Sequence, residues 1–231
     1  MPFSIHADSG HTPIATGTLR TLYADDTLLL FDKPAGLLAV PGRGPDKQDS
    51  LSARAQTGYP DALIVHRLDQ ATSGLMLMAR GTEAQRALSR AFAARAVGKR
   101  YVAVVDGVPN APDSLDGWGV IDLPIMIDWP NRPRRIIDPP HGKPSVTRWR
   151  VLARLPGTHP CTRVELEPVT GRSHQLRVHL SALGHPILGD ELYAPPAVQA
   201  LSGRLLLHAC ALEFAHPVKG ERLRFESTAP F

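Results

Sequence analysis

The chain has 231 residues, 43% of them hydrophobic and 21% charged, which is ordinary for a globular protein with a substantial core. No apolar run approaches the roughly 20 residues of a membrane span, and the first residues lack the apolar stretch of a signal peptide, so we expect a cytoplasmic protein without a membrane partner. The formal net charge of +4 favours an anionic partner such as nucleic acid, although abundant arginine is equally typical of a GC-rich genome.

The N-terminal part of the chain predicts an arm, a strand and a short helix. Residues 1–20 are polar without a clear period and predict the arm, ahead of a single domain over residues 21–231. Residues 28–44 predict a strand, a turn, a second short strand and a glycine-rich loop. Residues 49–50 are typical caps for a helix that ends at Gly58.

The next elements flank a polar turn. Two apolar runs, 62–69 and 74–80, predict strands on either side of it. Thr82 predicts the cap of an amphipathic helix over residues 82–97, because apolar side chains recur there every three or four residues. Residues 99–107 are rich in β-branched side chains and predict another strand.

The second half of the chain predicts loops followed by an antiparallel sheet. Residues 107–143 are dense in proline, glycine and tryptophan and predict surface loops. Residues 145–155 and 161–169 alternate as an antiparallel pair, 173–184 predict a helix that ends at its glycine, and 204–228 predict two strands around a turn. We therefore expect the α+β class, with a mixed, mainly antiparallel sheet and flanking helices.

One segment carries the candidate chemistry. The sequence HRLDQATSGLMLMAR, residues 66–80, places His66, Arg67, Asp69 and Ser73 between two apolar runs, where a rigid scaffold can present reactive groups. An aspartate beside Thr-Ser-Gly is most often a turn or capping residue. The residue types alone therefore leave the role of Asp69 open.

Several segments, in order, resemble the RluA family of pseudouridine synthases, which are RNA-modifying isomerases. HRLDQATSG matches that family's HRLDxxTSG signature without a departure, and LPIMIDWPNRPR is similar to its short members. The other similar segments are LLLFDKPAGLLAVPG, GKRYVAVVDG, ELEPVTGRSHQLRVHLSALGHPILGDELYA and RLLLHACALEFAHPVKGE. The resemblance runs from about residue 20 to the end of the chain. It implies the pseudouridine synthase fold and a catalytic domain over residues 21–231, without a separate N-terminal RNA-binding domain.

The resemblance also implies roles for individual residues. Asp69 matches the family's essential aspartate, and Arg172 the arginine that pairs with it. Tyr101 matches the tyrosine that stacks on the target base, and Arg67 the arginine that enters the space left by a flipped base. Each residue also has a plainer interpretation, as a strand aromatic, a surface cation or a phosphate contact.

RNA is the partner that the resemblance implies. The short branch implies a uridine in the tRNA anticodon stem-loop, in a 23S rRNA hairpin loop, or in both. We expect His66 and the loop residues Trp129, Asn131 and Arg132 to contact RNA, with a packed surface loop as the alternative for the last three. We expect a monomer.

The implied reaction breaks the N1–C1′ bond of uridine, turns the base and rejoins it through C5. It needs a carboxylate as nucleophile or as general base, so a covalent adduct and a glycal-type intermediate both stay open. We expect no cofactor and no metal, because the bond breaks and forms on one base and the sequence carries no matching motif. A noncatalytic RNA-binding protein with the same fold is the alternative, but Asp69, Tyr101 and Arg172 all stand at matching positions.

Two other sites have the right residue types in the wrong arrangement. His174 and His179 lie five residues apart, so a helix would point them away from a common metal ion. His66, Asp69 and Ser73 are the residue types of a hydrolase triad, but Ser73 lacks the surrounding G-x-S-x-G elbow.

Overall fold

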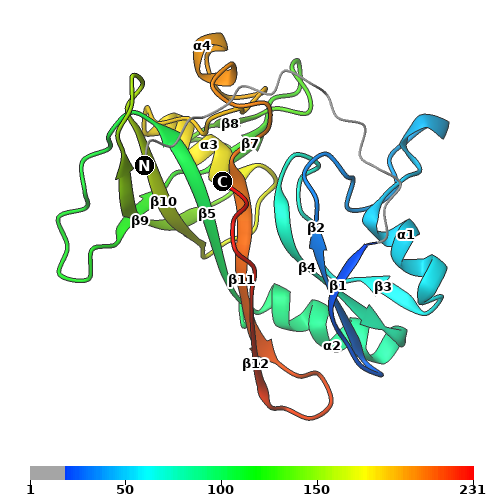
Figure 1. Ribbon diagram of the computed structural model, residues 1–231. Helices are drawn as coiled ribbons and strands as arrows, with labels where there is room; N and C mark the ends of the chain where they lie inside the picture. Colours follow the sequence, from blue (N-terminus) through cyan, green and yellow to red (C-terminus); the bar gives the residue numbers. More distant parts are fainter. Residues whose placement is uncertain (1–18) are drawn as a thin grey trace.

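The computed structural model describes residues 19–231, so all but the last two residues of the predicted arm lie outside the described part (Figure 1). A ten-stranded sheet runs in the order β1-β2-β4-β11-β5-β10-β9-β6, with β3 added to β4 and β12 to β11. Its strands are β1 (Arg20–Ala24), β2 (Leu28–Lys33), β3 (Ala62–Ile64), β4 (Ser73–Arg80), β5 (Gly98–Asp106), β6 (Gly119–Asp122), β9 (Val146–Leu155), β10 (Cys161–Pro168), β11 (Leu207–Ala215) and β12 (Arg222–Glu226). Every pairing in it is antiparallel except that of β4 with β11, which confirms the predicted α+β class.

The β4–β11 pairing joins the two halves of the sheet. Figure 1 shows β1 to β4 with α1 (Leu51–Gly58) and α2 (Gly81–Ala93) on one side of β11, and β5, β9 and β10 with α3 (Gln175–Ala182) on the other. A Cβ on Gly74 would lie 2.3 Å from the carbonyl oxygen of Ala209, and Gly74 has a φ of +109°. Only glycine permits both that close approach and that backbone conformation.

Burial explains which runs became strands and helices. In β4 every residue except Arg80 is buried, because one face of the strand packs with residues of α2 and the other face with residues of α1. The apolar stripe of α2 includes Ala84 and Leu88, as its three-to-four-residue period predicted. Ser50 accepts a hydrogen bond from the amide of Ala53 and so caps α1, also as predicted.

The region predicted as loops contains regular structure. Residues 119–122 form β6 against β9, and β7 (Ile125–Ile127) pairs with β8 (Arg135–Ile137) in a separate two-stranded sheet. The prediction was wrong because buried Ile121 and Ile125 anchor strands too short to show a period. The remaining helical pieces are η1 (Pro45–Lys47) and α4 (Pro196–Gln199). Within residues 19–231, none of the helices has the length and apolar character of a membrane span.

Three local predictions also differ from the structure. The second strand of residues 28–44 is a single bridge between Leu38 and Ser50. Thr82 does not cap α2, because the helix already begins at Gly81 without a side-chain cap. The strand predicted over residues 62–69 ends at Ile64, and the chain therefore leaves the sheet before the segment that carries Asp69.

Candidate active site

A buried lysine holds the loop that carries Asp69. The ammonium of Lys33, at the end of β2, donates hydrogen bonds to the carbonyls of Pro34 (2.9 Å), Leu37 (2.8 Å) and Gln70 (3.0 Å). The Gln70 carbonyl also accepts the amide of Gly36. Burial lowers the pKa of Lys33 to about 7, although the charge of Asp69 acts in the opposite direction. Two segments of chain are thereby fixed around one side chain.

Asp69 lies in a cleft of about 520 Å³ between the two halves of the sheet. Among the described residues that line it, Asp69 is the one acidic side chain. The cations that line it are Arg67, Arg95, Lys99, Arg172 and Arg177. A cleft of this charge concentrates an anionic substrate around one carboxylate.

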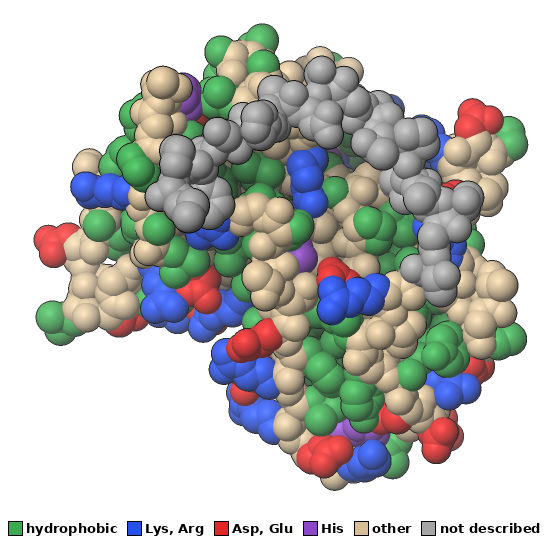
Figure 2. Space-filling view, viewed as in Figure 1, with side chains coloured by type: hydrophobic (Ala, Val, Ile, Leu, Met, Phe, Trp, Pro, Cys, Tyr) green, Lys and Arg blue, Asp and Glu red, His purple; other side chains and the backbone are tan. Residues whose placement is uncertain are grey.

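Elsewhere on the sheet, several arginines are paired with acids. Arg150 pairs with Glu165, and Arg148 and Arg100 pair with Glu167. Figure 2 shows the same mixture, with blue side chains lying beside red ones rather than in one broad basic patch. The cleft differs from these paired sites in having several cations for a single acid.

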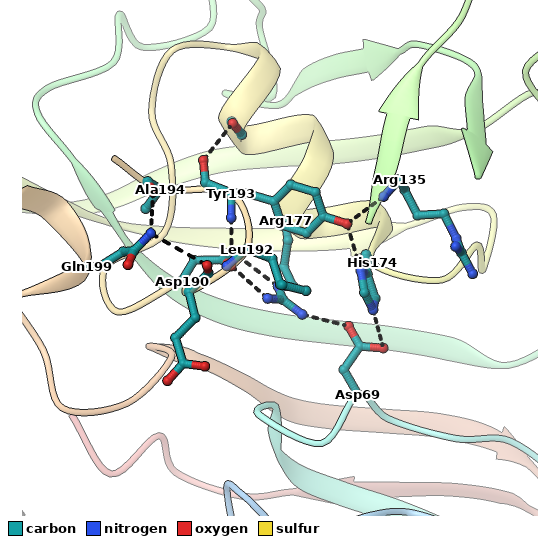
Figure 3. Close-up of polar contacts among 11 residues, drawn as sticks. Asp69, Arg135, His174, Arg177, Asp190, Leu192, Tyr193, Ala194 and Gln199 are labelled. Carbon is teal, nitrogen blue, oxygen red and sulfur yellow. Dashed lines mark hydrogen bonds and ion pairs between the residues drawn. The ribbon is translucent and has the colours of Figure 1, made fainter. Parts of the chain in front are cut away.

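Two basic side chains from the start of α3 face the carboxylate of Asp69 (Figure 3). Arg177 Nη1 lies 3.5 Å from Asp69 Oδ2, and His174 Nε2 lies 3.9 Å from Oδ1. Arg177 is itself fixed by a two-point ion pair with fully buried Asp190, at 2.8 and 2.6 Å. The orientation of Arg177 toward Asp69 is thus set by the protein.

The predicted pairing of Arg172 with Asp69 is therefore wrong in this structure. Arg172 is exposed, and its guanidinium donates at 3.4 Å to the carbonyl of Pro144. Arg172 precedes α3, whereas Arg177 lies within the buried part of that helix and faces Asp69. A buried arginine needs an acidic partner, and the sequence alone did not show that Arg177 rather than Arg172 would be the buried one. A catalytic role for Arg172 stays a prediction.

Tyr101 lines the same cleft from β5, where it is paired with Leu166 of β10 and Ala209 of β11. Burial raises the pKa of the Tyr101 hydroxyl far above its ordinary value, and the charge of Asp69 raises it further. The phenol is therefore neutral at physiological pH. Tyr101 and Asp69 line the same cleft, and the stacking role of Tyr101 stays a prediction.

His66 has a role inside the protein that was not predicted. Its Nε2 accepts the amide of Leu77 at 2.9 Å, and its ring stacks on Phe92 with centroids 4.6 Å apart. Burial lowers the pKa of His66 to about 3, so the ring is neutral and Nε2 stays free to accept. Although the ring lines the cleft, the structure favours this support of the loop over the predicted RNA contact. Arg67 is exposed at the cleft, and its entry into the space left by a flipped base stays a prediction.

The other predicted RNA contacts lie on the turn between β7 and β8. Trp129 is 61% exposed, Arg132 stacks over its ring at 4.8 Å, and the amide of Asn131 donates to Asp128. None of these residues lines the cleft. The hairpin is nevertheless tied to the site, because the backbone amide of Arg135 donates to the hydroxyl of Tyr193. An RNA contact at this turn stays a prediction.

The hydrolase triad and the paired-histidine metal site, which the sequence disfavoured, are not formed by the residues that the structure describes. Ser73 Oγ is 2.9 Å from His208 Nδ1 rather than bonded to His66. His179 lies between the Thr147 hydroxyl and the Leu123 carbonyl. In the part of the chain that the structure describes, no three metal-ligating side chains gather.

The mixed sheet and its cationic cleft around one aspartate match a known class of RNA-modifying enzyme. Residues 27–182 match the RNA pseudouridylate synthase family, and the chain belongs to that family of isomerases. It is 47% identical over 213 residues to the dual-specificity RNA pseudouridine synthase RluA of Escherichia coli strain K12, covering 92% of this chain and 94% of that protein. It is 46% identical over 221 residues to the protein of the same name from Pasteurella multocida strain Pm70, covering 96% and 98%.

Solved structures agree with the sequence relatives. The fold is similar to human RNA pseudouridylate synthase domain containing 1, with a TM-score of 0.74 and 28% identity, covering 100% of this chain and 87% of that one. Human RNA pseudouridylate synthase domain containing 4 gives a TM-score of 0.69, also at 28% identity, covering 91% and 88%. The predicted pseudouridine synthase fold is confirmed.

Proposed function

We propose that this RNA pseudouridine synthase uses Asp69 as its essential carboxylate and converts specific uridines in RNA stem-loops, in the tRNA anticodon arm and in a 23S rRNA hairpin. The observation that carries the proposal is the position of Asp69 as the one acid, among the described residues, in a cleft lined by five cations. Two substrates are supported by the dual-specificity relatives, which are 46–47% identical to this chain. We further propose a cytoplasmic monomer.

Base flipping follows from the position of Asp69. A carboxylate inside a cleft reaches a sugar or base only after the nucleotide leaves its stack, which costs a few kcal/mol. Tyr101 offers the extruded base an aromatic face. Arg67 is exposed beside Asp69 and can fill the vacated space, where a planar guanidinium stacks and donates hydrogen bonds.

The neighbours of Asp69 serve its chemistry. Arg177 gives the carboxylate of Asp69 a cationic partner at 3.5 Å, and either nucleophilic attack or proton abstraction would use that carboxylate. Because the Arg177 guanidinium is anchored by two hydrogen bonds to Asp190, it can hold the carboxylate of Asp69 without rearranging during the reaction. The buried, neutral hydroxyl of Tyr101 can hold or return a proton near the base. The same residues serve the covalent adduct and the glycal pathway.

Tritium release from RNA that carries 5-³H-uridine tests the proposal, because formation of the new bond at C5 expels that hydrogen. Wild type, Asp69→Asn and the control Asp113→Asn would be compared on tRNA and 23S hairpin transcripts. Asp113 is exposed on the loop after β5 and does not line the cleft, so it isolates the effect of an Asp→Asn change at the site.

We expect wild type and Asp113→Asn to release tritium from both RNAs, and Asp69→Asn from neither. Release by Asp69→Asn would exclude Asp69 as the essential carboxylate. Release by wild type from one RNA alone would refute dual specificity while leaving the role of Asp69 intact.

A further inference from the structure

His174 sits at a special backbone position directly before α3. Its φ of +58° and ψ of +12° are left-handed, a conformation that few residues other than glycine adopt. Its side chain is 13% exposed and lies between Tyr193 and Asp69 (Figure 3). The strained conformation directs the imidazole toward the carboxylate.

The hydroxyl of Tyr193 determines which imidazole nitrogen carries the proton. Tyr193 Oη accepts the backbone amide of Arg135 at 2.9 Å and lies 2.7 Å from His174 Nδ1. With the amide of Arg135 as donor to it, the hydroxyl has its own proton available for Nδ1. Burial raises the pKa of Tyr193 to about 12, so that proton is retained at physiological pH. When the hydroxyl donates that proton, Nδ1 is the acceptor and the imidazole proton lies on Nε2.

Nε2 is the nitrogen that faces Asp69, at 3.9 Å from Oδ1. That distance is an electrostatic contact rather than a hydrogen bond, and catalytic contacts of this kind commonly shorten when substrate binds. Arg177 faces the other oxygen, Oδ2, at 3.5 Å. The two oxygens of the carboxylate thus have different basic partners, both carried by the start of α3.

We propose that His174 is a positioning residue for Asp69, in which Nε2–H is directed at carboxylate Oδ1 and the Tyr193 hydroxyl holds the imidazole in that tautomer. The proposal rests on the proposed catalytic role of Asp69. The ring of Tyr193 adds rigidity, because the guanidinium of Arg177 lies over it at 5.1 Å and the His174 ring meets its edge. Asp190 links Arg177 to Tyr193, since it accepts hydrogen bonds from the guanidinium of Arg177 and from the backbone amide of Tyr193.

The charges around His174 make the contact measurable. Burial lowers the pKa of His174, Arg177 and Arg135 lower it further, and the carboxylates of Asp69 and Asp190 raise it. Removing the charge of Asp69 should therefore lower the pKa of His174 again, while the other charges stay in place. A histidine whose ring lay far from the carboxylate of Asp69 would not respond in this way.

Nitrogen-15 NMR of histidine-labelled protein gives the first test. In wild type at neutral pH we expect His174 as the neutral tautomer with the proton on Nε2, and Tyr193→Phe should give a mixture of tautomers. Asp69→Asn should lower the pKa of His174, and the nitrogen shifts of the control His159, which pairs with Asp106 at the end of β5, should not change. A pKa of His174 that is unmoved or raised in Asp69→Asn would overturn the proposal, whether or not the RNA substrate is correct.

Single-turnover tritium release with two substitutions of the same histidine gives the second test. His174→Gln places an amide donor near the position of Nε2, whereas His174→Asn reaches only the position of Nδ1. Asparagine tolerates the left-handed backbone better than glutamine, so a purely structural role ranks Asn above Gln. A positioning role ranks Gln above Asn.

We expect His174→Asn to lose at least tenfold in rate with RNA affinity unchanged, and His174→Gln to retain the greater part of the rate. Equal rates, or a faster Asn variant, would overturn the proposal. His159→Asn is the matched control and should react as wild type does. If wild type itself released no tritium, the proposed function would fail, and the NMR titration would still decide the contact between His174 and Asp69.

Discussion

Lys33 allows a sharp test of how the Asp69 loop is held. Its fully buried ammonium is the common donor to three backbone carbonyls, one of them directly after Asp69. Lys33→Met keeps most of the side-chain volume and removes every one of those donors. The Gln70 carbonyl keeps the amide of Gly36 as a donor, whereas the carbonyls of Pro34 and Leu37 lose the ammonium. Each acceptor left without a partner in a buried site costs about 1–3 kcal/mol, so we expect a loss of about 2 kcal/mol or more at pH 7.

The stability lost in Lys33→Met should increase with pH, because the pKa of Lys33 is lowered in the folded protein. The unfolded chain keeps this lysine protonated up to about pH 10, whereas the folded protein releases the proton above a pKa of about 7. Between those values the unfolded state binds more protons, so the stability of wild type rises with pH. Linkage gives a gain of about 2 kcal/mol from Lys33 between pH 7 and pH 9. Below pH 7 both states are protonated and the contribution becomes constant.

Urea unfolding of wild type and Lys33→Met at pH 7, 8 and 9 measures this difference directly. Wild type should gain about 2 kcal/mol relative to the variant across the series. Lys219→Met, a substitution of an exposed lysine in the β11–β12 turn, is the control and should follow wild type. Parallel pH dependences for wild type and Lys33→Met would refute the buried, shifted ammonium. Lys33→Met should also slow turnover, because the loop around Asp69 is released.

The remaining predictions concern the arginines, His66 and salt. Arg177→Met should lower the free energy of unfolding by about 3–5 kcal/mol, because buried Asp190 loses its cation, while exposed Arg172→Met should change it by less than about 0.5 kcal/mol in the same urea assay. Arg172→Met should weaken RNA binding in a filter assay and preserve turnover of bound RNA; normal affinity with lost turnover would instead support the pairing predicted from the sequence. His66→Asn should cost about 1–3 kcal/mol in urea unfolding, since the Leu77 amide loses its acceptor, with RNA affinity unchanged. If Arg67, Arg95 and Arg172 each neutralise one phosphate, a plot of log affinity against log salt should have a slope of about −2, and a flat plot would exclude the cleft as an RNA surface.

Local pattern was enough for much of the fold. The amphipathic period of α2, the serine cap of α1 and the alternation of β9 and β10 each depend on neighbours within a few residues. The parallel pairing of β4 with β11 was not readable in this way. It depends on the contact of Gly74 with Ala209, which lies far along the chain. No local pattern in either segment indicates that the two segments pair.

The same division applies to the site. The motif around Asp69 and its likeness to a family indicated the carboxylate, Tyr101 and the class of reaction from sequence alone. Which arginine faces Asp69 was decided only by tertiary structure. Arg172 and Arg177 belong to one motif, but Arg177 is buried in α3 and Arg172 is exposed before it. The positions of His174 and Tyr193 were likewise hidden, since a hydrogen bond is set by distances of a few ångströms between segments that sequence order does not bring together. Sequence determined which groups are present, and packing determined which of them meet.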